Sequence, residues 1–179
     1  MDPFATLGIE RTFEIDLAVV EKTHRELSRT LHPDRHARGG PTERRYALSK
    51  AVEVNEAWRI LRDPIQRAEA LFTLAGIPVG ETHEPKPSTE FLMDMMEQRE
   101  GLAEAREKRD LGAARRLASE IEARTKLVEG QLSLGFGESS RDREKLVALV
   151  PLLGELRFYR RFLDEVSEFE DWALAKVGE

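Results

Sequence analysis

The chain of 179 residues contains no cysteine. This absence excludes disulfide bonds, iron–sulfur clusters held by the chain's own thiolates, and cysteine-based zinc sites. Long apolar runs are missing too, since no stretch approaches the ~20 apolar residues that cross a bilayer. The amino terminus also lacks the basic start and apolar segment of a signal peptide. We therefore expect a cytoplasmic protein with no membrane contact.

Sequence motifs of catalysis are missing as well. The sequence contains no glycine-rich phosphate loop, no nucleophile motif and no convincing set of metal ligands. His32 and His36 are four residues apart, but Pro33 interrupts the helix that would align their imidazoles. We therefore predict no metal site, no cofactor and no enzymatic activity of the chain itself.

The charge of the chain is unevenly distributed. Residues 1–75 carry no net charge, so the remaining residues carry all of the net charge of −6. An acidic carboxy-terminal part argues against nucleic acid as a partner, because phosphate binding requires a basic surface. It favours a protein partner that has a basic patch.

Residues 1–75 show start and stop signals of short helices. Asp2 followed by Pro3 is typical of a helix start, and Gly8 is a suitable stop. Asp16 and the pair Asp63-Pro64 give the same start signal further along the chain. These signals predict a short opening helix, a second helix after Asp16 and a last helix after Asp63.

Two amphipathic stripes predict a helical hairpin within this region. The first stripe consists of Leu17, Val20, His24, Leu27 and Leu31, and the facing stripe of Val54, Ala57, Trp58 and Leu61. Apolar stripes of this kind pack two helices against each other in antiparallel order. His24 lies within the first stripe, so we expect a packed, hydrogen-bonded histidine rather than a titrating one.

The predicted hairpin carries the tripeptide His32-Pro33-Asp34 at its exposed tip, and a basic stripe of Lys22, Arg25 and Arg29 on its first helix. Together with Asp2-Pro3-Phe4 and the run from Asn55 to Pro64, this pattern resembles the J-domain. That module lets co-chaperones act on DnaK-type ATPase chaperones. The resemblance implies that Asp34 engages a charged network on the chaperone and that ATP hydrolysis is accelerated. The chaperone-binding residues that we expect are His32, Pro33, Asp34, Arg35, Lys22, Arg25 and Arg29.

The carboxy-terminal part of the sequence predicts a second helical unit. Residues 76–88 hold three prolines and two glycines, which favours a linker or an ordered crossover. Three helical patterns follow, at about 89–109, 111–134 and 141–176. Gly135-Phe136-Gly137 is expected to break the last two apart, and Pro151 to kink the third pattern or split off its first turns. Short connections indicate an antiparallel bundle.

The predicted fold is thus all-α, without strands. We expect a J-domain over residues 1–75, a linker or crossover over 76–88, and a three-helix bundle over 89–179.

The helix predicted from Thr89 has apolar residues on two sides. Phe91, Met95 and Leu102 form a core stripe. Roughly opposite lies a cluster of Leu92, Met93, Met96, Glu97, Glu100 and Glu104. Three of the four methionines of the chain fall in this helix, and methionine suits adaptable binding surfaces. Either this cluster binds a partner, or part of it contacts the J-like unit. Phe158 either extends the cluster or belongs to the bundle core.

The order of a J-domain, a Pro/Gly crossover, the helix from Thr89 and Leu156-Arg157-Phe158 resembles the HscB family of iron–sulfur co-chaperones. The resemblance covers nearly the full chain. It implies that the bundle binds the scaffold protein on which clusters are assembled, and that the J-domain hands this scaffold to the specialised chaperone HscA. The scaffold-binding residues that it implies are Leu92, Met93, Met96, Glu97, Glu100, Glu104 and Phe158.

Two departures from the family pattern stand out. Met96 and Gly101 are not the residues most expected at their positions, and Gly101 weakens its helix by ~1 kcal/mol relative to alanine. The cysteine-based metal-binding segment of eukaryotic relatives is missing, which indicates a bacterial type.

We therefore expect a monomeric co-chaperone that stimulates an HscA-like chaperone and delivers the cluster scaffold to it. One alternative is a J-protein whose bundle serves another client or dimerises. The other is a helical adaptor that works without a chaperone.

Overall fold

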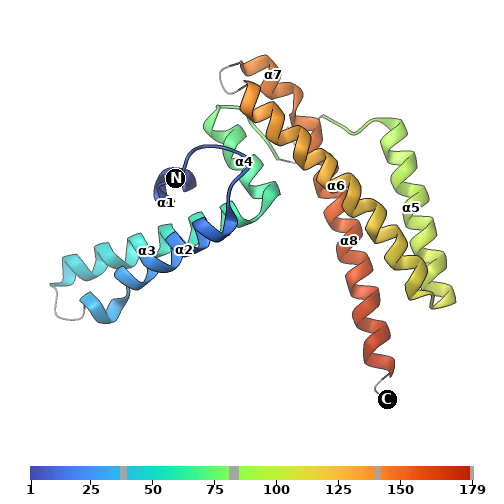
Figure 1. The fold of residues 1–179 in the computed structure, drawn as a ribbon, viewed down its shortest axis with the longest axis horizontal. Coiled ribbons are helices and arrows are strands. Elements are labelled where there is room, and N and C mark those ends of the chain that lie inside the picture. Colours follow the sequence, from blue (N-terminus) through green and yellow to red (C-terminus); the bar gives the residue numbers. More distant parts are fainter. Residues whose placement is uncertain (37–39, 81–84, 140–141, 178–179) are drawn as a thin grey trace. The chain divides into compact units, whose positions relative to one another are not determined.

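The computed structural model describes residues 1–36, 40–80, 85–139 and 142–177. Over these residues the chain forms helices and no strands, which confirms the predicted all-α fold (Figure 1). The helices are α1 (Pro3–Leu7), α2 (Leu17–Thr30), the 3-10 helix η1 (Pro33–His36), α3 (Pro41–Arg62), α4 (Pro64–Leu74), α5 (Thr89–Lys108), α6 (Leu111–Ser139), α7 (Arg143–Ala148) and α8 (Val150–Val177). Within the described part of the chain, no helix is both long and apolar enough to cross a membrane.

The chain divides into two compact units. The first comprises Met1–Val79 with Phe136–Arg143, and the second comprises Gly80–Gly135 with Glu144–Glu179. The end of α6 therefore groups with the amino-terminal unit, although the expected boundaries lie at residues 75 and 89.

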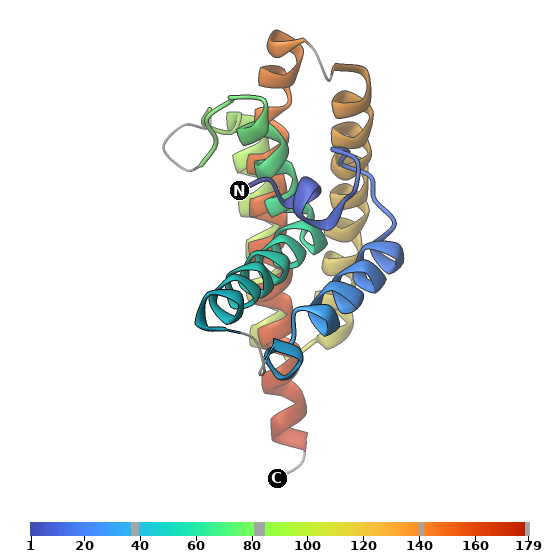
Figure 2. The same ribbon diagram turned by 90° about the vertical axis from the view of Figure 1, so that its left-hand side faces the viewer.

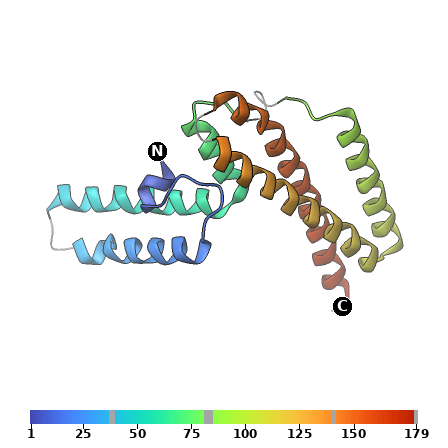
Figure 3. The same cartoon turned by 45° about the horizontal axis from the view of Figure 1, so that its top comes forward.

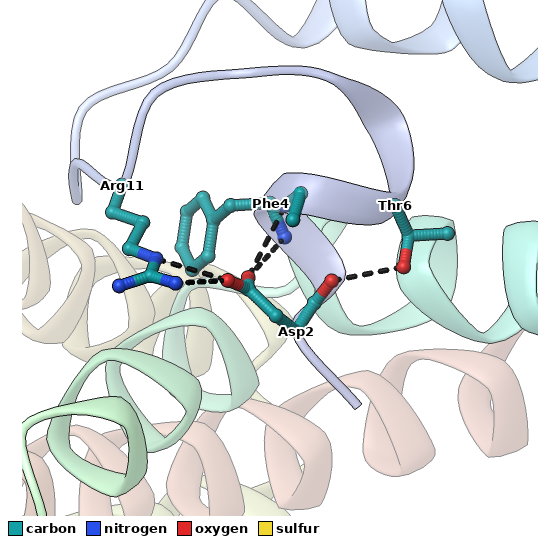
Figure 4. A network of polar contacts seen from close by, with 5 residues as sticks. Asp2, Phe4, Thr6 and Arg11 are labelled. Carbon is teal, nitrogen blue, oxygen red and sulfur yellow. Dashed lines mark hydrogen bonds and ion pairs between the residues drawn. The ribbon is translucent and has the colours of Figure 1, made fainter.

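Aspartate caps start three helices of the first unit, as the sequence predicts. The Asp2 carboxylate accepts hydrogen bonds from the backbone N–H groups of Phe4 and Ala5 at 3.0 and 3.2 Å. It also binds the Arg11 guanidinium at 2.6 Å (Figure 4). Asp16 and Asp63 cap α2 and α4 in the same manner. These bonds satisfy N–H groups that lack partners in the first turn of a helix.

The helices α2 and α3 run antiparallel as a hairpin (Figure 3). Val54, Ala57 and Leu61 of α3 are buried, but of the predicted stripe on α2 only Val20 is. Leu17 is 44 % exposed, so its prediction as a core residue is wrong. The physical reason is that a hairpin partner shields only part of a helix surface, which leaves the stripe on α2 partly open.

His24 is half-buried on the inner side of this hairpin. Its Nε2 lies 2.9 Å from the Asn55 Oδ1, and its ring stacks on Trp58 with centroids 5.6 Å apart. The expected hydrogen bond is therefore present, although the imidazole is not fully enclosed.

The predicted break at Gly135-Phe136-Gly137 is wrong, because α6 continues to Ser139. Phe136 packs against Phe13 and Phe72 in the first unit, with ring centroids 6.1 and 4.9 Å away. This burial holds the helix together across the two glycines. Gly135 instead allows the Leu149 side chain to lie close to the backbone of α6, since an added Cβ would be 2.6 Å from that side chain.

Arg67 on α4 is a buried cation that sequence analysis did not identify. Its side chain donates a hydrogen bond to the Leu61 carbonyl at 2.6 Å, and its guanidinium lies 4.9 Å from the centre of the Phe13 ring. Because Leu61 belongs to the last turn of α3, Arg67 joins the end of that helix to α4.

In the second unit, α5, α6 and α8 lie along one another (Figures 1 and 2). The buried side chains include Met95, Leu102, Ile121, Leu132, Leu153, Leu156, Tyr159, Phe162, Val166 and Phe169. Pro151 lies in the first turn of α8, and α7 precedes it as a separate helix. The predicted splitting of the last helix by Pro151 is therefore confirmed.

Candidate binding sites

The first candidate site is the hairpin tip, which we define as His32, Pro33, Asp34 and Arg35. The tip follows directly on α2 and is shaped by η1. The backbone N–H of Asp34 points to the His32 Nδ1 at 3.3 Å, and the Arg35 N–H donates to the His32 carbonyl at 3.0 Å. These local bonds give the tip a defined shape.

The Asp34 carboxylate points into solvent at this tip. Its side chain is 90 % exposed, and its Oδ2 lies 3.6 Å from the His32 Nδ1. An exposed carboxylate keeps its full capacity to accept hydrogen bonds from a cationic partner. The geometry therefore presents Asp34 outward, in the manner that a binding role requires.

The basic stripe of α2 leads to this tip. Lys22, Arg25 and Arg29 are exposed and share one face of the helix by their spacing. Arg25 also pairs with Glu21 one turn earlier, on the same helix. The stripe carries positive charge next to the Asp34 carboxylate, so a partner would meet both signs in a fixed order.

The second candidate site lies on α5, which has a buried and an exposed side. Leu92, Met93 and Met96 are 37 %, 66 % and 63 % exposed, whereas Met95 between them is 4 % exposed. We call the exposed side the α5 surface and define it by Leu92, Met93, Met96, Glu97, Glu100 and Glu104. The helical spacing thus places three apolar side chains in solvent within two turns.

The carboxylates of the α5 surface are all exposed. A hydrogen bond from the Lys108 ammonium lowers the pKa of Glu104, so this group is ionised at neutral pH. The α5 surface therefore combines an apolar part with a negatively charged part further along the helix.

Phe158 of α8 packs beside the start of this surface. Its ring meets Phe91 edge-to-face with centroids 5.5 Å apart, and the Arg161 guanidinium lies 4.6 Å from its centre. Phe158 is half-buried, whereas Phe162 and Phe169 of the same helix are buried in the core. It is thus a boundary residue that links α8 to the first turns of α5.

Two ionisable groups of α8 have raised pKa values. Partial burial raises the pKa of Glu155, and burial together with the nearby Glu155 raises the pKa of Tyr159. Tyr159 also contacts Phe91, with ring centroids 5.7 Å apart. Tyr159 is therefore part of the packing around Phe91, next to Phe158.

The sequence analysis missed a pocket of about 360 Å³ next to Phe158, which Lys86, Arg157 and Arg161 line. The available signal was the run Arg157-Phe158-Tyr159-Arg160-Arg161, in which arginines flank two aromatic residues. Periodicity alone could not show that residues 85–87 meet this run.

Comparison with known proteins gives matches over both units. A DnaJ domain model matches residues 2–70, and a model described as the HSCB C-terminal oligomerisation domain matches residues 87–167. The co-chaperone protein HscB homolog of Shewanella oneidensis is 34% identical, and the match covers 96% of this chain and 98% of that relative. The homolog of Aeromonas salmonicida is 31% identical, and the match covers 96% of this chain and 97% of that relative.

Solved structures show the same similarity. The chaperone HscB from Vibrio cholerae superposes with a TM-score of 0.84 at 28% identity, and the match covers 97% of this chain and 99% of that one. Human co-chaperone protein HscB superposes with the same TM-score of 0.84 at 24% identity, over 95% of this chain and 82% of that one, which shows a shared fold.

Proposed function

The chain belongs to the HscB family of J-domain co-chaperones in iron–sulfur cluster assembly, and on this premise we propose how its two units divide the work. The amino-terminal unit stimulates the ATPase of a DnaK-type, HscA-like chaperone. The bundle binds the scaffold protein on which clusters are assembled and delivers it to that chaperone. Because one chain carries both sites, we propose that a monomer is sufficient.

The observation that carries this proposal is the outward placement of Asp34. A carboxylate that is 90 % exposed at a hairpin tip contributes nothing to the core and is free to meet a partner. The cationic side chains of α2 add steering toward an acidic chaperone surface, because complementary charge accelerates encounter. A carboxylate tip with a basic flank therefore suits a partner that offers a cationic group to Asp34 and acidic groups to the basic stripe of α2.

The α5 surface supports the second half of the proposal. Exposed apolar side chains such as Met93 and Met96 gain free energy when a partner removes them from water. The flanking carboxylates orient a basic partner and weaken the binding of acidic ones. An apolar centre with a charged border is the usual anatomy of a specific protein interface.

The two sites belong to different compact units of one chain. Linking two binding modules makes the second contact intramolecular and raises its effective concentration. The co-chaperone thereby brings the scaffold to the chaperone at the time of ATP hydrolysis.

Asp34→Asn tests the proposed function. The substitution keeps the size of the side chain and removes its charge, so we expect stimulation of the chaperone ATPase to fall to near the unstimulated rate. Steady-state phosphate release measures this rate, and circular dichroism confirms the helical fold.

The matched control is Glu10→Gln, which removes a carboxylate from another exposed position of the same unit. It should stimulate like the unmodified chain. Full stimulation by a folded Asp34→Asn variant would contradict the proposed role of the tip.

A further inference from the structure

A basic pocket lies at the edge of the proposed scaffold-binding surface. It encloses about 360 Å³ between residues 85–87, which precede α5, and the face of α8 formed by Gly154, Arg157, Phe158 and Arg161. Of the described residues that line it, Lys86, Arg157 and Arg161 are cationic and none is acidic. Phe158 is at once a wall of this pocket and a member of the proposed scaffold-binding set.

The pocket is positively charged, whereas the part of the chain that contains it has a net negative charge. The chain beyond residue 75 carries all of the net negative charge, and the α5 surface ends in three exposed glutamates. The described lining of the pocket contributes three positive charges and no negative one, which attracts an anion. The pocket therefore has a charge that is complementary to a carboxylate.

The pocket is also shaped by packing. The Arg161 guanidinium is held 4.6 Å from the centre of the Phe158 ring, and this stacking leaves the edge of the guanidinium available to donate hydrogen bonds. Pro85 and Pro87 fix the backbone on both sides of Lys86. Such preorganisation lowers the entropy cost of holding a carboxylate.

We propose that this pocket binds a carboxylate-bearing segment of the scaffold protein, one that carries Asp or Glu side chains. The inference rests on the proposed function, because it assigns a second contact to the same partner. The scaffold-binding surface then has an acidic end on α5, an apolar centre at Leu92, Met93 and Phe158, and a basic end at the pocket. A partner with the opposite order of charges fits in one orientation only.

The test is the affinity of the full chain for the purified scaffold protein, measured by calorimetry or interferometry. The variant Lys86→Glu/Arg157→Glu reverses two of the cations and leaves the stacked Arg161 and Phe158 in place. We expect binding to weaken roughly tenfold at low salt, mainly through slower association, and the loss to shrink as salt screens the charges. The control Lys126→Glu, with Lys126 exposed on α6 of the same unit, should change binding less than twofold.

A second readout identifies the group that enters the pocket. A carbodiimide activates a carboxylate, and the unprotonated amine of a neighbouring lysine then displaces the urea by-product to form an amide, so we expect it to couple Lys86 to an Asp or Glu of the scaffold. Mass spectrometry of the cross-linked peptide would show this bond.

Each outcome decides the proposal. Unchanged scaffold affinity in the doubly reversed variant, with Leu92→Ala still weakening binding, would overturn the pocket and leave the proposed function standing. Tighter binding of inorganic phosphate to the unmodified chain than to the doubly reversed variant, with equal scaffold affinity of the two, would identify a small-anion site and overturn it as well. If the unmodified chain does not bind the scaffold, the proposed function fails and the pocket proposal falls with it.

Discussion

Aspartate side chains in the amino-terminal unit serve two different purposes. Asp2, Asp16 and Asp63 accept hydrogen bonds from the first N–H groups of their helices. Asp34 points outward into solvent instead. Sequence analysis could predict the caps because they depend on neighbours within three residues. The proposed role of Asp34 came from the resemblance of its motif, since the side-chain contact described for it, with His32 two residues away, gives no structural reason for a carboxylate at this position.

The burial of Arg67 and the close packing at Gly135 could not be predicted from the sequence. An arginine in an amphipathic helix is usually exposed, so its burial against Phe13, distant in sequence, has no local signal. A glycine pair is usually a helix stop. Only the packing of Leu149 shows that Gly135 is required for a close approach.

Asp2→Ala should destabilise the chain by about 1 kcal/mol at neutral pH, because it removes the cap of α1. Partial burial opposes ionisation, but the Ala5 N–H and the Arg11 guanidinium outweigh it and lower the pKa of Asp2. A lowered pKa in the folded chain gives stability that is present above the unfolded pKa and is lost as the pH falls through the folded pKa. Denaturant unfolding at pH 7 and at acidic pH measures both effects.

The control is Asp2→Asn, since asparagine is also a good cap and loses only the ion pair with Arg11. We expect a smaller loss than with alanine. A difference between Asp2→Ala and the unmodified chain that stays constant down to the lowest pH would show that the carboxylate charge plays no part.

At the scale of elements, the helix α5 shows how much periodicity predicts. The spacing of its apolar residues separated Met95 and Leu102, which are buried, from Met93 and Met96, which are exposed. Proline chemistry, rather than periodicity, predicted that Pro151 would kink or split the last helical pattern, and the structure divides it into α7 and α8. The glycine signal at the end of α6 was misleading, because the contacts of Phe136 come from residues more than sixty positions away.

Leu92→Ala combined with Phe158→Ala should weaken scaffold binding by about 2–4 kcal/mol, the range of interface anchors. Leu92 is exposed and Phe158 is only half-buried, so the melting temperature should fall much less than after truncation of a core residue. Calorimetric titration and thermal unfolding measure the two quantities.

Leu127→Ala is the matched control, because Leu127 is 69% exposed on α6 and lies outside the α5 surface. It should leave binding unchanged. Met95→Ala should instead cost about 2–5 kcal/mol of stability as a core truncation. A loss of this size in the Leu92/Phe158 variant would assign those side chains to the core.

Gly135→Ala and Gly130→Ala should act in opposite directions on the same helix. A Cβ at Gly135 would lie 2.6 Å from the Leu149 side chain, whereas a Cβ at Gly130 would meet open space. We expect the first change to destabilise by about 1–2 kcal/mol through overpacking, and the second to stabilise by up to about 1 kcal/mol through helix propensity. Denaturant unfolding compares the two, and equal stabilisation by both would show that Leu149 moves aside without cost.

At the scale of the whole molecule, the central feature is the separation of the two proposed binding sites onto different units of the chain. Composition predicted part of this, since the net charge of −6 is confined to the sequence after residue 75. The resemblance to a family implied the residues that we propose for each site. The grouping of residues 136–143 with the first unit could not be predicted, because it depends on Phe136 contacts between distant segments.

The measurement that tests this separation most directly is the ATPase rate of the chaperone with and without scaffold protein, for three forms of the chain. The unmodified chain should stimulate the rate, and scaffold should raise it further. Asp34→Asn should lose all stimulation yet bind scaffold normally. Leu92→Ala with Phe158→Ala should keep the basal stimulation and lose only the increment that scaffold adds. If either variant loses both activities while remaining folded, the two sites are not independent and the account is wrong.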